Sequence, residues 1–83
     1  MPTGRQHFIK EYKYLTFVEV DNPKGITRKF ECKNNNSQAV LGIVKWHGAW
    51  RQYCYFPTIQ AVYSAGCLDD ISGFVKGINT KAL

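Results

Sequence analysis

Long hydrophobic runs are missing from this sequence, and acidic side chains are scarce. No apolar stretch approaches the roughly 18 residues that a membrane-spanning helix needs. The segment Met1–His7 also lacks the apolar core of a signal peptide. We therefore expect a non-secreted, cytoplasmic protein that makes no contact with a membrane.

Cysteine is rare too: Cys32, Cys54 and Cys67 are the three in the chain. An odd number of widely spaced cysteines argues against a disulfide framework. Neither His7 nor His47 lies at zinc-ligand spacing from a cysteine, so we expect no metal site. Each cysteine stands among apolar residues, and we expect each to be a small buried hydrophobe in a reducing compartment.

Sequence patterns of catalysis are missing as well. Gly42 stands alone within an apolar run, so there is no glycine-rich loop to cradle a phosphate. Asp69 and Asp70 are adjacent, and adjacent helical side chains point about 100° apart, which is too far to act on one bond. No serine lies in a nucleophile-elbow sequence. We expect no catalytic residue, no cofactor and no enzymatic activity.

What the chain does contain is the composition of one small globular domain over residues 1–83, with 45% hydrophobic and 20% charged residues. The formal net charge is +5, and the excess of Lys and Arg lies within residues 1–56. A basic domain attracts nucleic acid, anionic nucleotides or acidic protein surfaces. The same net charge is also ordinary for the solubility of a small protein.

Alternating aromatic and β-branched residues, separated by turn sequences, predict four strands and one helix. Residues 1–8 are expected to be flexible, and a sheet is expected over residues 12–56. The strands are placed at 12–20, 26–33, 39–46 and 50–56, and the helix at 67–78. The order predicts an α+β fold: a four-stranded antiparallel β-meander with one C-terminal α-helix packed on one face.

Side-chain alternation also predicts which residues share a face. On the first strand, Leu15 and Phe17 should share a face with Glu19. On the second strand, one face should hold Arg28, Phe30 and Cys32. We expect the second strand to be an edge strand, because its other face is charged. The third strand, apolar on both faces, is expected to be central and covered on each side. Gly42 within it is expected to lie where a side chain would clash with an aromatic ring or the helix.

The helix carries apolar residues at spacings of three and four, which predict one buried stripe. The stripe consists of Leu68, Ile71, Phe74, Val75 and Ile78. Ser64 or Gly66 is expected to cap the helix, with Asp69 and Asp70 in its first turn, where the helix dipole favours negative charge.

The segment Lys45–Phe56 holds five of the twelve aromatic residues and is predicted to be a β-hairpin with a two- or three-residue loop. With a three-residue loop, Trp46 faces Trp50. Arg51, Tyr53 and Tyr55 alternate with Gln52, Cys54 and Phe56. Cys54 and Phe56 are the better core residues, so we expect Arg51, Tyr53 and Tyr55 on the uncovered face. The candidate binding residues are Arg51, Tyr53, Tyr55, Lys45, Trp46, His47 and Trp50, with Arg28 and Lys29 as secondary basic contacts.

Three interpretations of this segment stay open. The tryptophans and tyrosines can belong to the core as cross-strand pairs. They can form a protein interface, in which Trp, Tyr and Arg are enriched. They can also form a surface that stacks bases and contacts phosphates.

Three short motifs in residues 40–78 resemble a set of short uncharacterised proteins in bacteriophage and gut-bacterial genomes. The motifs are Leu41-Gly42-Ile43-x-Lys45-Trp46, the segment Trp50–Pro57, and Cys67-Leu68-x-Asp70-Ile71-x-x-Phe74. The resemblance implies a protein encoded by a phage or a mobile element that works in the cytoplasm of a bacterial host cell. It also implies that the chain binds and blocks a host factor or sequesters an anionic nucleotide ligand.

We therefore expect a non-enzymatic binding module whose uncovered β face contacts a host protein or an anionic nucleotide. The alternatives are a nucleic-acid-binding accessory protein that uses the same face, and a virion or structural subunit. Self-association into a homodimer is compatible with each interpretation.

Overall fold

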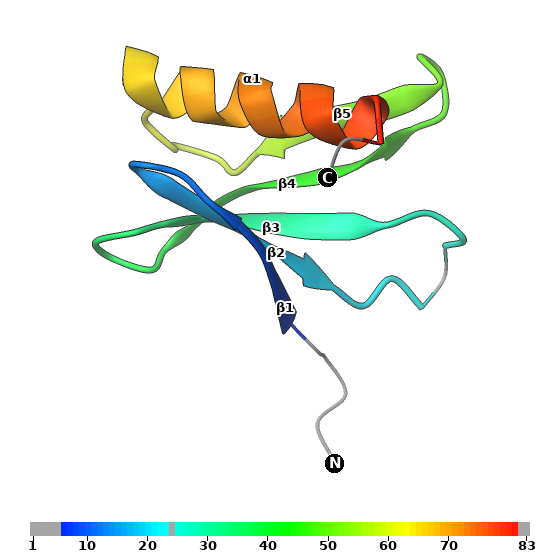
Figure 1. Ribbon diagram of the computed structural model, residues 1–83, viewed down its shortest axis with the longest axis horizontal. Helices are drawn as coiled ribbons and strands as arrows, with labels where there is room; N and C mark the ends of the chain where they lie inside the picture. The colour runs from blue at the N-terminus through cyan, green and yellow to red at the C-terminus, as the bar shows by residue number, and fades with distance from the viewer. Residues whose placement is uncertain (1–5, 24, 82–83) are drawn as a thin grey trace.

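The computed structural model describes residues 6–23 and 25–81, which form one antiparallel sheet and one helix (Figure 1). The strands follow one another in space in the order β1-β2-β3-β4-β5. They are β1 (Gln6–Glu11), β2 (Leu15–Val20), β3 (Lys29–Asn34), β4 (Val40–His47) and β5 (Gln52–Pro57), and α1 (Ala65–Asn79) follows. The α+β meander with one C-terminal helix is confirmed, but the sheet has five strands and not four.

The additional strand is β1, in a region where we expected flexible chain up to residue 8 and one continuous strand over 12–20. The chain instead turns between Glu11 and Leu15, where the Tyr12 N–H donates to the carbonyl oxygen of Leu15 at 2.7 Å. β1 pairs with β2 through the backbone, with an irregular register between Phe8 and Lys10. An edge strand held by backbone hydrogen bonds needs little hydrophobic alternation, so its sequence gives a weak signal. The part of the flexible segment that covers residues 1–5 lies outside the described residues.

Strand β3 is the middle strand of the sheet, so the prediction that it forms an edge is wrong. Phe30 pairs with Glu19 of β2 on one side and with Val44 of β4 on the other. Its charged residues point to the sheet face that no helix covers. The expectation that β4 is covered on each side is also wrong. The helix covers only one face of β4, although its residues are apolar on both faces.

The β4–β5 hairpin has a four-residue loop, Gly48–Arg51, which is longer than either predicted loop. His47 pairs with Gln52, and Trp46 therefore faces Tyr53 and not Trp50. Within the loop, the Trp50 N–H donates to the carbonyl oxygen of His47 at 3.1 Å. Arg51 has a φ of 55°, a left-handed conformation that ends the turn.

Helix α1 begins two residues earlier than predicted. The Ser64 side chain caps it by accepting a hydrogen bond from the Cys67 N–H at 3.2 Å, as expected for one of the two proposed caps. Asp69 and Asp70 consequently lie beyond the first turn. Asp70 has a different role: its Oδ2 accepts a hydrogen bond from the Tyr14 N–H at 3.2 Å, which ties the helix to the β1–β2 turn.

The core lies between α1 and one face of the sheet. Phe74 is fully buried, its ring stacks on Phe17 at a centroid distance of 4.1 Å, and its edge meets Phe30 at 5.1 Å. The whole buried cluster consists of Leu15, Phe17, Phe30, Cys32, Val44, Ile71, Phe74 and Ile78. Leu68, which we expected in the stripe, is 53% exposed. The helix begins earlier than predicted but keeps the expected period. The sheet covers a narrower part of the helix surface than the predicted apolar stripe, so Leu68 stays exposed.

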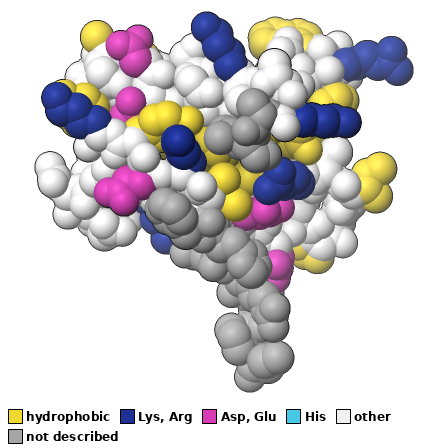
Figure 2. All heavy atoms as spheres, in the orientation of Figure 1, with side chains coloured by type: hydrophobic (Ala, Val, Ile, Leu, Met, Phe, Trp, Pro, Cys, Tyr) yellow, Lys and Arg dark blue, Asp and Glu magenta, His cyan; other side chains and the backbone are white. Residues whose placement is uncertain are grey.

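Hydrophobic side chains are visible below the helix, with Lys and Arg side chains around them (Figure 2). Within the part of the chain that the structure describes, no helix is long and apolar enough to span a membrane.

Replacing Phe74 by alanine removes the ring that joins the helix to two strands. We expect the Phe74→Ala variant to lose about 3–5 kcal/mol of unfolding free energy, measured by urea denaturation. Leu68→Ala is the matched control on the same helix, because Leu68 is mostly exposed. A Phe74→Ala variant that unfolds at the same urea concentration as the Leu68→Ala control would contradict this role of the ring.

Gly42 is buried on the helix side of β4, and a Cβ atom there would collide with the Tyr55 hydroxyl and lie 2.8 Å from the Phe56 carbonyl oxygen. The predicted clash with an aromatic ring is thus confirmed. We expect Gly42→Ala to lower the unfolding free energy by about 1–3 kcal/mol, since the ring and backbone must shift. Gly48→Ala is the control, because a Cβ at that loop position has no neighbour within 4 Å. Equal melting temperatures for the two variants would rule out the clash.

Candidate binding surface

The sheet face that points away from α1 has no covering layer within the described residues, and we call it the open face. Side chains alternate along a strand, so the neighbours of the buried residues Phe30 and Val44 point to this face. The open face comprises Val18 from β2, Lys29, Glu31 and Lys33 from β3, Ile43, Lys45 and His47 from β4, and Cys54 and Phe56 from β5. It is therefore built from four neighbouring strands.

Three rings form a continuous strip at the β4–β5 end of the open face, and we call Phe56, His47 and Trp50 the aromatic strip. The His47 ring meets Phe56 edge-on at 5.7 Å and Trp50 edge-on at 4.9 Å. The Lys45 Nζ lies 4.9 Å from the centre of the Phe56 ring, within the range of a cation–π interaction. Trp50 at the hairpin tip is 67% exposed, so its ring is available to a partner.

Two lysines lie opposite each other on β3 and β4, the two inner strands of the open face. Lys29 of β3 pairs in register with Lys45 of β4. Like charges directly opposite each other on neighbouring strands are destabilising. Among the described residues no carboxylate forms an ion pair with either lysine. Lys33 and Glu31 also lie on the open face, and their opposite charges balance. The face therefore keeps the positive charge of Lys29 and Lys45, which an anionic partner would neutralise.

The structure corrects the expected positions of Tyr53 and Tyr55, which lie on the helix side of the sheet. Tyr53 is opposite Trp46, with the two rings 5.4 Å apart, and Tyr55 is opposite the buried Val44. Both tyrosines pack against the core cluster. We expected Cys54 and Phe56 in the core because they are more apolar, but a tyrosine can bury its ring when its hydroxyl has a hydrogen-bond partner.

The hydroxyl of Tyr55 has such a hydrogen-bond partner. Its hydroxyl lies 2.8 Å from the hydroxyl of Tyr63, which in turn donates to the Leu41 carbonyl oxygen at 2.6 Å. Burial, together with the Tyr63 hydrogen bond, raises the pKa of Tyr55 far above its ordinary value. The hydroxyl therefore stays protonated, and the ring acts as part of the core.

The two arginines that we expected at the site lie elsewhere. Arg51 is in the hairpin loop and does not share the alternation of β5. Arg28 precedes β3 on the helix side, where its Nε and one Nη donate to Glu19 at 3.0 and 2.9 Å. Lys29, the next residue, points to the open face. Of the expected binding residues, the open face and its hairpin tip therefore gather Lys29, Lys45, His47 and Trp50, whereas Trp46 lies on the helix side with Tyr53 and Tyr55.

Phe56 is a residue of the candidate surface that sequence reasoning assigned to the core. Its alternation with Tyr55 was visible in the sequence, but the sequence does not say which of the two faces the helix covers. The same ambiguity applies to Cys54.

The thiol of Cys32 is not activated as a nucleophile. Cys32 is buried in the core, and desolvation raises its pKa to about 11, although a hydrogen bond with Tyr55 opposes this rise. The thiol is therefore protonated at neutral pH. The described residues contain no group of three or more His, Cys, Asp or Glu side chains that could hold a metal ion.

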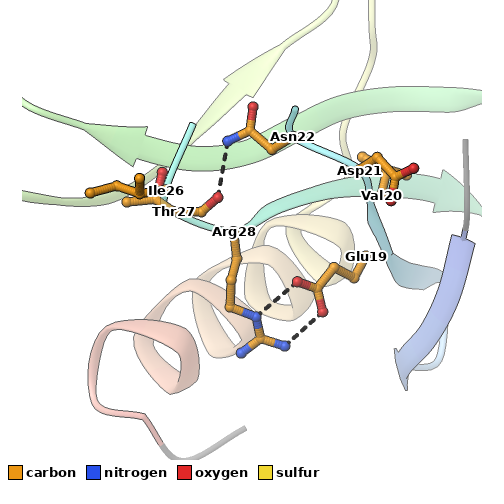
Figure 3. A pocket seen from close by; sticks show the side chains of 7 residues that line it. All are labelled: Glu19, Val20, Asp21, Asn22, Ile26, Thr27 and Arg28. Atoms are coloured by element: carbon orange, nitrogen blue, oxygen red, sulfur yellow. Dashed lines mark hydrogen bonds and ion pairs between the residues drawn. The ribbon is translucent and has the colours of Figure 1, made fainter. Parts of the chain in front are cut away.

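Two hollows adjoin Arg28, and neither is lined by the residues that define the open face above. The first, of about 360 Å³, is lined by Glu19, Val20, Asp21, Asn22, Ile26, Thr27 and Arg28 (Figure 3). Its polar groups largely engage one another, since Arg28 pairs with Glu19 and the Asn22 amide donates to the Thr27 carbonyl oxygen at 3.0 Å. The second, of about 310 Å³, is lined by Arg28, Tyr53, Ile78 and Lys81.

The corrected face assignment changes what a substitution at Tyr53 should do. We expect Tyr53→Ala to lower the unfolding free energy by about 2–3 kcal/mol, because its ring packs against Phe30 and Trp46. Trp50→Ala, which removes an exposed ring from the same hairpin, should change it by less than about 0.5 kcal/mol. Both values are measured by chemical denaturation followed by circular dichroism. A Trp50→Ala variant that is less stable than Tyr53→Ala would contradict the position of Tyr53 on the helix side of the sheet.

Comparison with known proteins gives the chain a relative but no described activity. Over 68 residues it is 31% identical to an uncharacterised 9.3 kDa protein of Acholeplasma phage L2, a match that covers 82% of this chain and 87% of the phage protein. No family model matches the chain. No solved structure matches it either. The expected kinship with small bacteriophage proteins is confirmed, and the chain belongs to the same family as this 9.3 kDa phage protein.

Proposed function

We propose that the chain is a non-enzymatic binding protein whose open face binds single-stranded nucleic acid. The observation that carries this proposal is the pair of facing lysines, Lys29 and Lys45, beside the aromatic strip. Phosphates would neutralise the two ammonium groups, and unpaired bases would stack on the rings, above all on the exposed Trp50. One surface thus offers ammonium groups for the phosphates and aromatic rings for the bases.

Single strands fit this surface better than a duplex does. The open face belongs to a sheet, and a broad sheet face does not enter the major groove as a helix does. Single-stranded nucleic acid can spread its bases over such a face, as it does on other sheet-based binding domains. Membership in a phage protein family is compatible with an accessory role on phage or host nucleic acid.

A protein partner is the competing interpretation, and the same face would serve it. The charge distribution favours nucleic acid, because the centres of protein interfaces are depleted in lysine. Here two lysines without ion pairs among the described residues lie side by side on β3 and β4, the two inner strands of the face. A host protein that carries an acidic patch would be the exception.

The proposal is tested by fluorescence anisotropy with a labelled oligothymidine strand, titrated at several salt concentrations. Affinity for the single strand should fall steeply with salt, with a log–log slope of about −0.7 for each phosphate contacted. The double variant Lys29→Gln/Lys45→Gln should weaken binding and make this slope shallower by about 1.4. Trp50→Ala should weaken binding by about 1–3 kcal/mol without a change in slope.

The matched control is Lys13→Gln/Lys76→Gln, which removes the same charge from positions off the open face. Lys13 lies over the Tyr14 ring in the β1–β2 turn, and Lys76 lies in the last turn of α1. If the control pair weakens binding as much as the open-face pair, the affinity comes from net charge alone. Tighter binding to a duplex of the same length would also contradict the proposal.

A further inference from the structure

We infer that the hollow between the end of α1 and strand β5 is a binding site for a small organic carboxylate with an apolar body. The hollow has a volume of about 310 Å³ and is lined by Arg28, Tyr53, Ile78 and Lys81. It lies on the helix side of the sheet, so it is separate from the open face and does not rest on the proposed function.

The polar groups around this hollow are hydrogen-bond donors with unused capacity. The Tyr53 hydroxyl accepts a hydrogen bond from the Arg28 N–H at 3.1 Å, and no acceptor among the described residues takes its own proton. Glu19 engages the Nε and one Nη of Arg28, which leaves the second Nη for another acceptor. The Lys81 ammonium forms no ion pair within the described part of the chain.

The charge around the hollow also favours an anion. Of the described residues around the hollow, Arg28 and Lys81 supply two positive charges and Glu19 one negative charge, so a single carboxylate would balance this group. The carbonyl oxygens at the end of α1 would repel an anion if they were bare. Thr80 engages two of them, since its hydroxyl donates to the carbonyl oxygens of Lys76 and Gly77 at 2.9 and 3.2 Å.

The rest of the lining is apolar. Ile78 is 5% exposed and belongs to the core cluster, and the Tyr53 ring is held edge-on between Phe30 and Trp46. These two residues form a rigid apolar wall beside the three donors. The volume is near the lower limit for small-molecule sites, about 300–1,000 Å³, so the occupant should be a compact molecule and not a polymer.

Two features hold the site in place without a ligand. The Asn79 side chain binds the backbone of Tyr53 twice: its Oδ1 accepts from the Tyr53 N–H at 2.7 Å, and its Nδ2 donates to the Tyr53 carbonyl oxygen at 3.1 Å. On the other side, the Arg28 guanidinium lies 4.9 Å from the centre of the Phe30 ring. The helix end, β5 and Arg28 are thus fixed relative to one another, which lowers the entropy cost of binding.

The test is a titration of the full ¹⁵N-labelled chain followed by NMR, with benzoate as the probe and with the ionic strength held constant. Benzoate should shift the backbone amides of Arg28, Tyr53 and Lys81 in a saturable manner. Benzyl alcohol, which keeps the ring but not the charge, should bind at least about tenfold more weakly, the effect of losing charge-assisted hydrogen bonds. Inorganic phosphate, which has no apolar body, should also bind at least about tenfold more weakly.

Two variants separate the site from general charge effects. Lys81→Gln and Tyr53→Phe should each weaken benzoate binding by about three- to tenfold, the range of one lost hydrogen bond. Lys76→Gln is the control, because it removes the same charge from the last turn of α1 without touching the hollow. Tyr53→Phe keeps the buried ring, and the spectrum of each variant shows directly whether the fold is kept.

Saturable binding of benzoate that depends on Lys81 and on its own charge supports the site. The inference is overturned if benzoate causes no saturable shift, if benzyl alcohol or phosphate binds as tightly, or if Lys76→Gln and Lys81→Gln weaken binding equally. None of these outcomes bears on the open face, whose variants Lys29→Gln/Lys45→Gln should bind benzoate as the parent does.

Discussion

The packing of Phe74 on Phe17 is the contact on which the rest of the structure depends. A five-stranded meander of this size has a single helix to bury its hydrophobic side, and the stacked rings lie where that helix meets the sheet. The helix itself contains Gly66, Gly73 and Gly77, which lower its intrinsic stability, so tertiary packing must hold it. Because the contact closes one face, it also determines which face stays open.

The open face follows from having one helix and two sheet faces. A second apolar face without a covering layer would promote aggregation, and here lysines on β3 and β4 interrupt it. The same lysines repel each other, and no carboxylate among the described residues forms an ion pair with either of them. The proposed binding of nucleic acid depends on this combination of aromatic rings and positive charge close to a hairpin tip with an exposed tryptophan.

Polar groups, and not hydrophobicity alone, decide how the β4–β5 hairpin is oriented. Phe56 is more hydrophobic than Tyr55, yet Tyr55 packs against the core, because Tyr63 and the Leu41 carbonyl oxygen complete a hydrogen-bond chain with its hydroxyl. Gly42 leaves space for that hydroxyl on the neighbouring strand. The arrangement shows how a local feature, a lone glycine in a strand, allows a polar aromatic residue to take a core position.

The sequence by itself determined the α+β class, the meander order and the residues of β2 and β3 that share a face. It also determined Ser64 as one of two candidate caps and an apolar helix stripe that includes the buried Ile71, Phe74 and Ile78. Each of these depends on periodicity or on a contact within a few residues. Tertiary structure alone decided that β1 joins the sheet, that β3 is central, and that Tyr53 and Tyr55 lie under the helix while Phe56 does not. Alternation shows which side chains lie together, but the choice between the two faces depends on the four-residue loop ending at Arg51, the strand register and distant hydrogen-bond partners. Those interactions join residues that are far apart in the sequence, and no local pattern encodes them.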